Sequence, residues 1–156
     1  MKQFFLFASI ALASGLLFVN VYNSMIDATS WGTDIPKSIE TAREYFKTVN
    51  PGNFFRVFSP VNQVLGLLAL ILFWKVSTTV RIYLGIALVL YVLGDVFTFA
   101  YFYPRNDIMF KNPVTDIDTI RQAWTGWNSM NWLRSFIVLT GLIFSFLALR
   151  KIYTTK

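Results

Sequence analysis

Residues 132–149 read WLRSFIVLTGLIFSFLAL, an apolar run that carries one charge, Arg134. A helix of about this length and composition crosses the hydrocarbon layer of a membrane. Three more apolar segments have the same character, and the shortest lies in the second quarter of the chain. Together they predict four membrane-spanning helices, at about residues 4–23, 60–75, 82–103 and 131–149.

The composition of the whole chain agrees with this prediction. Of its 156 residues, 55% are hydrophobic and 14% are charged, which is too apolar for a water-soluble domain of this length. We therefore predict one all-α membrane domain over residues 1–156, with outer loops at 24–59 and 104–130. A secretory signal is the alternative for the first segment, but its apolar run continues past the cleavage-like Ala11-Leu12-Ala13, which favours a span.

The chain contains neither cysteine nor histidine. Thiol nucleophiles, disulfides, iron–sulfur clusters and histidine-ligated haem or zinc are thereby excluded. We expect no cofactor and no metal. The net charge of +6 is spread over the loops of a membrane protein, so we expect membrane lipids rather than nucleic acid as the partner.

The distribution of charge predicts an orientation. With four spans, the two termini and the link 75–81 share one side, where basic residues stand close to the helix ends without any acidic residue: Lys2, Lys75, Arg81, Arg150, Lys151 and Lys156. Short basic segments of this kind are typical of the cytoplasmic side. The sequence predicts a multi-pass protein of a bacterial inner membrane with both termini in the cytoplasm.

Each outer loop contains further helical signals. After Asp34 as a cap, apolar residues recur at helical spacing as far as Val49, and Asn50-Pro51-Gly52 ends the pattern. This predicts an amphipathic helix in the first loop, which either packs at the interface or forms a lid over the bundle. In the second loop, Pro104 predicts a turn, and Thr115 or Asp116 begins a helix that leads into the fourth span. Trp124 and Trp132 are expected in an aromatic belt.

Four polar residues are predicted to meet inside the bundle. At about 1.5 Å per residue, Asn20, Asn62, Asp95 and Arg134 all lie roughly 20 to 27 Å from the basic residue at the cytoplasmic end of their span. A charge that faces lipid is costly, so Asp95 and Arg134 should face inward and pair. They either form an ion pair that fixes the helix neighbours, or they line a polar pocket with the surrounding amides.

Two short motifs resemble a known family. The residues FYPRNDIMF at 102–110 resemble the Pro-x-Asn signature of the anthrone-oxygenase-like family of small four-helix integral membrane proteins. The residues WNSMNWLR at 127–134 resemble its Trp-x-x-x-Asn-x-x-Arg motif. The resemblance implies a four-helix bundle with Asn106, Asn131 and Arg134 at its functional end. For some members it also implies oxidation of phenolic anthrones by oxygen without an evident cofactor, although most members have no assigned function.

Two functions follow as hypotheses. The first is a polar outer pocket that binds a small hydrophobic aromatic or quinone-like molecule, in a cofactor-independent oxidoreductase with Arg134 and Asp95 as catalytic residues and Asp107 as another proton acceptor. The second is a non-catalytic accessory or lipid-binding subunit of a larger membrane complex, or a homo-oligomer. The predicted ligand-binding residues are Asn20, Asn62, Asn106, Asp107, Trp127, Asn131 and Arg134.

Overall fold

The computed structural model describes residues 2–111 and 116–154. These residues include 4 helices that are long and apolar enough to cross a membrane: Lys2–Trp31, Gly52–Phe73, Thr78–Lys111 and Ile117–Thr154. No strand occurs within those two described ranges. The chain is thus a multi-pass membrane protein with an all-α four-helix fold, as the sequence predicts.

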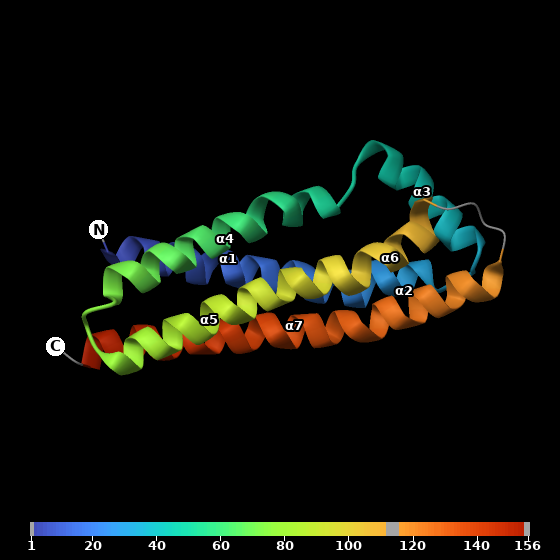
Figure 1. Ribbon diagram of the computed structural model, residues 1–156. Coiled ribbons are helices and arrows are strands. Elements are labelled where there is room, and N and C mark those ends of the chain that lie inside the picture. Colours follow the sequence, from blue (N-terminus) through green and yellow to red (C-terminus); the bar gives the residue numbers. More distant parts are fainter. Residues whose placement is uncertain (1, 112–115, 155–156) are drawn as a thin grey trace.

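The four long helices run side by side (Figure 1). They are built on α1 (Lys2–Tyr22), α4 (Gly52–Phe73), α5 (Thr78–Phe97) and α7 (Ile117–Thr154). Both termini and the short α4–α5 link lie at one end of the bundle, and α3 (Lys37–Thr48) lies at the other (Figure 1). We call the end that carries α3 the outer end. The half nearer the termini is held by an apolar core that includes Leu6, Ile10, Ala69, Phe73, Leu84 and Leu142.

All four spans extend beyond their predicted outer ends. The second begins at Gly52 rather than at residue 60, and the fourth is continuous with the helix predicted before it and begins at Ile117. The first continues through a π-helical turn, η1 (Asn23–Asp27), into α2 (Ala28–Trp31). The third continues through η2 (Thr98–Phe102) and α6 (Tyr103–Asn106) to η3 (Asp107–Lys111). Much of the two predicted loops is therefore helical. Ala28, Trp31, Phe102 and Met109 of these extensions pack into an apolar cluster with residues of α3 and α7. Polar and charged residues are interspersed among them, so hydropathy ended the spans too early.

Pro104 does not form the predicted turn. The preceding segment, η2, adopts a wider helical turn in which the Tyr103 N–H donates to the Thr98 carbonyl, and Pro104 then occupies the first turn of α6. A proline in a first turn lacks only an N–H that would have no partner in the helix, and a π-helical turn relieves the clash of its ring with the preceding turn. Asn106 and Asp107 therefore continue outward on the helix instead of folding back over the bundle.

The fourth span begins where one of the two predicted signals lies. The Asp116 carboxylate accepts hydrogen bonds from the Thr119 hydroxyl and from the Asp118 N–H at 3.0 Å. The Thr119 hydrogen bonds are the main reason that the pKa of Asp116 lies below its usual value. Asp116 thus caps α7, whereas Thr115 lies outside the described residues.

The predicted amphipathic helix is α3, and it covers the outer end of the bundle. Ile39 and Ala42 are buried in a second apolar cluster, while Arg43 donates from Nε to the Met109 carbonyl at 2.6 Å and from Nη2 to the Ile108 carbonyl at 3.3 Å. Asp34 makes no side-chain cap, because Pro36 immediately precedes the helix and Asp34 contributes only its carbonyl to the Ser38 N–H. These contacts attach α3 to the extended end of the third span.

Candidate functional site

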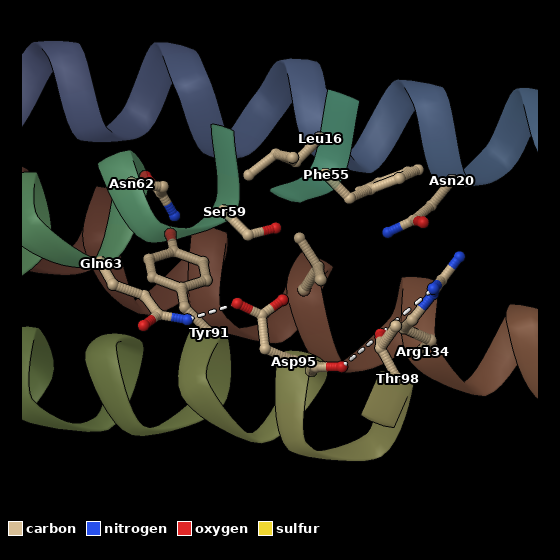
Figure 2. A pocket seen from close by; sticks show the side chains of 12 residues that line it. Leu16, Asn20, Phe55, Ser59, Asn62, Gln63, Tyr91, Asp95, Thr98 and Arg134 are labelled. Atoms are coloured by element: carbon tan, nitrogen blue, oxygen red, sulfur yellow. Dashed lines mark hydrogen bonds between the residues drawn. The ribbon is translucent and has the colours of Figure 1, made fainter. Parts of the chain in front are cut away.

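Two of the hollows in the outer half of the bundle contain the predicted site residues, and we name them the inner pocket and the outer cavity. The inner pocket has a volume of about 30 Å³, enough for about one water molecule. Figure 2 shows that side chains from all four long helices converge on it. It is lined by Leu16, Asn20, Phe55, Ser59, Asn62, Gln63, Tyr91, Gly94, Asp95, Thr98, Arg134 and Val138.

The outer cavity lies beneath α3 and is much larger, at about 270 Å³. Its walls combine an aromatic surface with a few charged and amide groups. The aromatic lining residues are Trp31, Phe46, Phe55, Phe102, Tyr103, Phe110 and Trp127. The polar ones are Asn23, Asp27, Arg43, Lys47, Asn50, Thr98, Asn106, Lys111 and Arg134. A largely apolar cavity with a small number of polar groups is typical of a site for a small organic ligand.

Arg134 forms part of both walls, together with Phe55 and Thr98. Its side chain is buried, with 6% of the residue exposed. The guanidinium donates from Nη2 to Asn131 Oδ1 at 2.5 Å and from Nη1 to Thr98 Oγ1 at 3.2 Å. It lies over the ring of Phe102, 4.4 Å from the centroid, and its Nε has no hydrogen-bond partner within residues 2–111 and 116–154. A buried cation that has no ion pair among the described residues thus borders the outer cavity.

The predicted ion pair between Asp95 and Arg134 does not form among the described residues. Asp95 instead accepts a hydrogen bond from Gln63 Nε2 at 2.5 Å. In Figure 2 the Asp95 carboxylate points towards Gln63 and Ser59, and the Arg134 guanidinium lies on the other side of Thr98. The two charges still interact electrostatically. Equal depth therefore brought both groups to one pocket, but the hydroxyl of Thr98 lies between them.

Asn131 connects the fourth span to the first. Its Nδ2 donates to the Asn20 carbonyl at 2.9 Å and to Ser24 Oγ at 2.6 Å, and its Oδ1 accepts from Arg134. All of its side-chain polar atoms therefore have partners, and the residue is fully buried. Its role in the structure is to hold Arg134 in place, and it lines neither hollow itself.

The other predicted site residues divide between the two hollows. Asn20 and Asn62 line the inner pocket, where Asn62 Oδ1 accepts from Ser9 Oγ at 3.1 Å and Asn20 Oδ1 has no partner in the part of the chain that the structure describes. Asn106 and Trp127 line the outer cavity. Asp107 lines neither and pairs with Lys111 at 2.7 Å on the surface.

Trp127 is a buried wall of the outer cavity. Its ring makes edge contacts with Trp31 and Phe102, at centroid distances of 5.0 and 5.5 Å. The indole Nε1 has no hydrogen-bond partner among the described residues. A buried indole N–H normally finds an acceptor, so Trp127 Nε1, like Arg134 Nε, is a buried donor that lacks one in the described part of the chain.

Several cavity residues did not emerge from the sequence, and Asp27 is the most important of them. Asn20, Asn23, Asp27 and Trp31 recur at intervals of three and four residues, which places them on one helix face. This signal was hidden because the first span was expected to end at residue 23. Arg43 and Phe46 from α3 were missed as site residues for a related reason, since an amphipathic pattern does not show which part of the bundle the helix covers.

Comparison with known proteins gives one match. A family model described as anthrone oxygenase matches residues 53–144 of the chain. The matched part begins in α4 and ends within α7, so it includes Asp95, Thr98, Asn106, Trp127 and Arg134 and leaves out the first span and α3. No curated protein and no solved structure matches the chain.

Proposed function

The chain belongs to the anthrone oxygenase family, and from this premise we propose that it binds a small hydrophobic aromatic or quinone-like molecule in the outer cavity and oxidises it with dioxygen. The observation that carries the proposal is the position of Arg134. Its buried guanidinium has no ion pair among the described residues and borders a cavity whose walls are aromatic. Such a group attracts an oxyanion that develops on an otherwise apolar ligand.

The shape and polarity of the proposed substrate agree with the residues that line the outer cavity. A flat polycyclic phenol or ketone can pack against Trp31, Phe102, Phe110 and Trp127 while its oxygen approaches Arg134. Because Arg134 is buried, its interaction with an oxyanion is stronger than that of a cation at the surface. Asp95, beyond Thr98, balances the charge of Arg134 from a distance without neutralising it by direct contact.

The reaction can be written for the simplest anthrone. Loss of a proton from the methylene carbon of the central ring gives an aromatic phenolate, whose oxygen Arg134 stabilises. Dioxygen then oxidises this carbon. One oxygen atom of dioxygen becomes the oxygen of the new carbonyl group. The other oxygen atom leaves as water with the two methylene hydrogens. The product is an anthraquinone, and dioxygen is the only co-reactant.

The site requires access from the membrane, which agrees with the proposed location of the protein. We place the chain in a bacterial inner membrane with both termini in the cytoplasm, because basic residues flank the short segments at that end of the bundle. The outer cavity then opens on the opposite face, under α3. A hydrophobic substrate would reach it from the surrounding lipid.

Two measurements on the purified protein in detergent test the proposal. Anthraquinone binding is followed by quenching of tryptophan fluorescence, since Trp31 and Trp127 line the cavity. Oxygen uptake is followed with anthrone as substrate. The natural chain should bind anthraquinone and oxidise anthrone. Arg134→Met should lower the turnover of anthrone about 100-fold or more, the usual effect of removing one group that stabilises an oxyanion.

Arg105→Met is the matched control, because Arg105 lies at the same end of the bundle, stacks on Tyr101 at 3.4 Å and lines neither hollow. It should leave both measurements unchanged. Equal turnover in the natural chain and in a folded Arg134→Met variant would refute the role of Arg134. If the natural chain shows no binding of anthraquinone and no turnover of anthrone, the proposed function is refuted.

A second candidate is supported by the rim of the outer cavity, where Lys47 and Lys111 lie beside the aromatic walls. An anionic lipid could place its headgroup on this rim, which would make the chain a lipid-binding or accessory subunit. Native mass spectrometry decides between the two. Displacement of a retained lipid by anthraquinone supports the oxidase. A lipid that anthraquinone does not displace, in a chain without oxygen uptake, supports the accessory role.

A further inference from the structure

The oxidation proposed above needs a group that accepts the methylene proton, and the outer cavity contains one carboxylate. The chain has eight acidic residues, all within the part that the structure describes. Of these, Asp27 alone lines the outer cavity. Asp95 lines only the inner pocket, whose volume of about 30 Å³ is too small for an aromatic ring. A substrate ring in the outer cavity therefore lies next to Asp27 and not next to Asp95.

The Asp27 carboxylate makes no polar contact with the described residues around it. The residue is the last of η1 and is partly buried. Neither a hydrogen bond nor an ion pair involves its side chain anywhere in the described ranges. In contrast, Asp107 is paired with Lys111, and Glu44 with Lys47. A carboxylate without a partner is free to take up a proton.

Asp27 also lies where the cavity meets the membrane side of the molecule. A groove of about 500 Å³ runs between the outer part of the first span and α3, and it shares Asn23, Asp27, Trp31, Phe46 and Pro51 with the outer cavity. The exposed rings of Tyr22 and Tyr45 form its outer part. A ligand that enters the cavity along this groove passes the Asp27 carboxylate.

We infer that Asp27 is the catalytic base of the oxidation, and this inference rests on the proposed function. The Asp27 carboxylate takes the proton from the methylene carbon, the C–H bond breaks, and its electron pair enters the ring system to leave the negative charge on the ring oxygen. Arg134 faces that oxygen from α7, while Asp27 belongs to the end of the first span. Because the two side chains are not paired with each other, each keeps its charge for its own step.

Exchange of the methylene hydrogens measures this step without the oxidation. The natural chain, Asp27→Asn, Asp27→Glu and Asp107→Asn are incubated with anthrone in deuterated buffer without oxygen, and deuterium uptake is measured by mass spectrometry above the background without protein. Binding of anthraquinone, which has no methylene hydrogen, is measured in parallel. Asp27→Asn should bind normally and lose about 100-fold or more of the catalysed exchange. Asp27→Glu should recover part of it, and Asp107→Asn should behave as the natural chain.

The outcomes separate the inference from the function on which it rests. Full exchange in Asp27→Asn with normal binding overturns the role of Asp27 and leaves the proposed function intact. If Asp27→Asn does not bind anthraquinone, Asp27→Glu decides, because binding without exchange in that variant also overturns the inference. Loss of binding in both variants assigns Asp27 a structural role instead. A natural chain that neither binds nor exchanges refutes the proposed function itself.

Discussion

Arg134 donates to Asn131 Oδ1 at 2.5 Å, one turn away on the same helix, while Asn131 Nδ2 holds the Asn20 carbonyl and Ser24 Oγ of the first span. The amide thus fixes the guanidinium without neutralising it. A carboxylate in the same position would form a buried ion pair with Arg134 and neutralise the charge of the guanidinium. The choice of an amide at this position is what leaves Arg134 available to a ligand.

Asn131→Asp should therefore lower the turnover of anthrone tenfold or more, although Asp and Asn have nearly the same shape. The new carboxylate would pair with Arg134 and would also lose the two hydrogen bonds that Nδ2 donates. Asn53→Asp makes the same chemical change at an exposed position on α4 and should have no effect. The measurement is oxygen uptake in detergent. Unchanged turnover in a folded Asn131→Asp protein would contradict the role given to the charge of Arg134.

Arg43→Met should release α3 from the outer end of the bundle. Arg43 donates hydrogen bonds to the Met109 and Ile108 carbonyls, which lie in the last turn of the third span. Without these bonds, the amides of Lys37–Thr48 should exchange with deuterium several-fold faster, as measured by hydrogen exchange and mass spectrometry. Lys37→Met, an exposed position on the same helix, should not change the exchange rate. Equal protection in both variants would indicate that the apolar face around Ile39 holds α3 by itself.

The number and type of the spans could be predicted because hydropathy and helix length depend on local composition alone. The same reasoning placed Asn20, Asn62, Asp95 and Arg134 around one pocket, because residues at equal depth on neighbouring inward faces must meet. The resemblance of residues 102–134 to the family also agrees with the match of the family model to residues 53–144.

The remaining details depend on contacts that no single helix contains. Thr98 separates Asp95 from Arg134 because it bonds to the guanidinium and, through the same hydroxyl, to the Gly94 carbonyl. The position of Asp27 depends on the continuation of the first span through η1 into α2, whose Ala28 and Trp31 pack against α3 and α7. Depth along a helix predicts which residues share a level, but it does not predict which of them touch.

Gly141→Ala should destabilise the bundle. A Cβ at Gly141 would lie 2.8 Å from Cε1 of Tyr91 on α5, and the hydroxyl of the same tyrosine bonds to Ser145 at 3.0 Å. We expect a loss of about 1–3 kcal/mol from the forced shift, measured as a lower midpoint of thermal unfolding. Gly15→Ala is the control, because its added Cβ would meet no atom of the described residues within 4 Å apart from its own chain neighbours and helix backbone, and it should leave the midpoint unchanged or raise it. A lower midpoint for Gly15→Ala alone would contradict the packing described.

Trp124→Phe tests the difference between an aromatic belt and an internal contact. Trp124 was expected in the belt, but its Nε1 donates to the Ala28 carbonyl at 2.7 Å, and its ring lies against Gly32. Removal of this bond should cost about 1 kcal/mol and lower the unfolding midpoint by roughly 2–4 °C for a chain of this size. Trp132, with 49% of the residue exposed on the outside of α7, keeps the belt interpretation, and Trp132→Phe should leave the midpoint unchanged in detergent. Equal shifts in the two variants would show that the bond to Ala28 does not contribute, and that both tryptophans act through the belt alone.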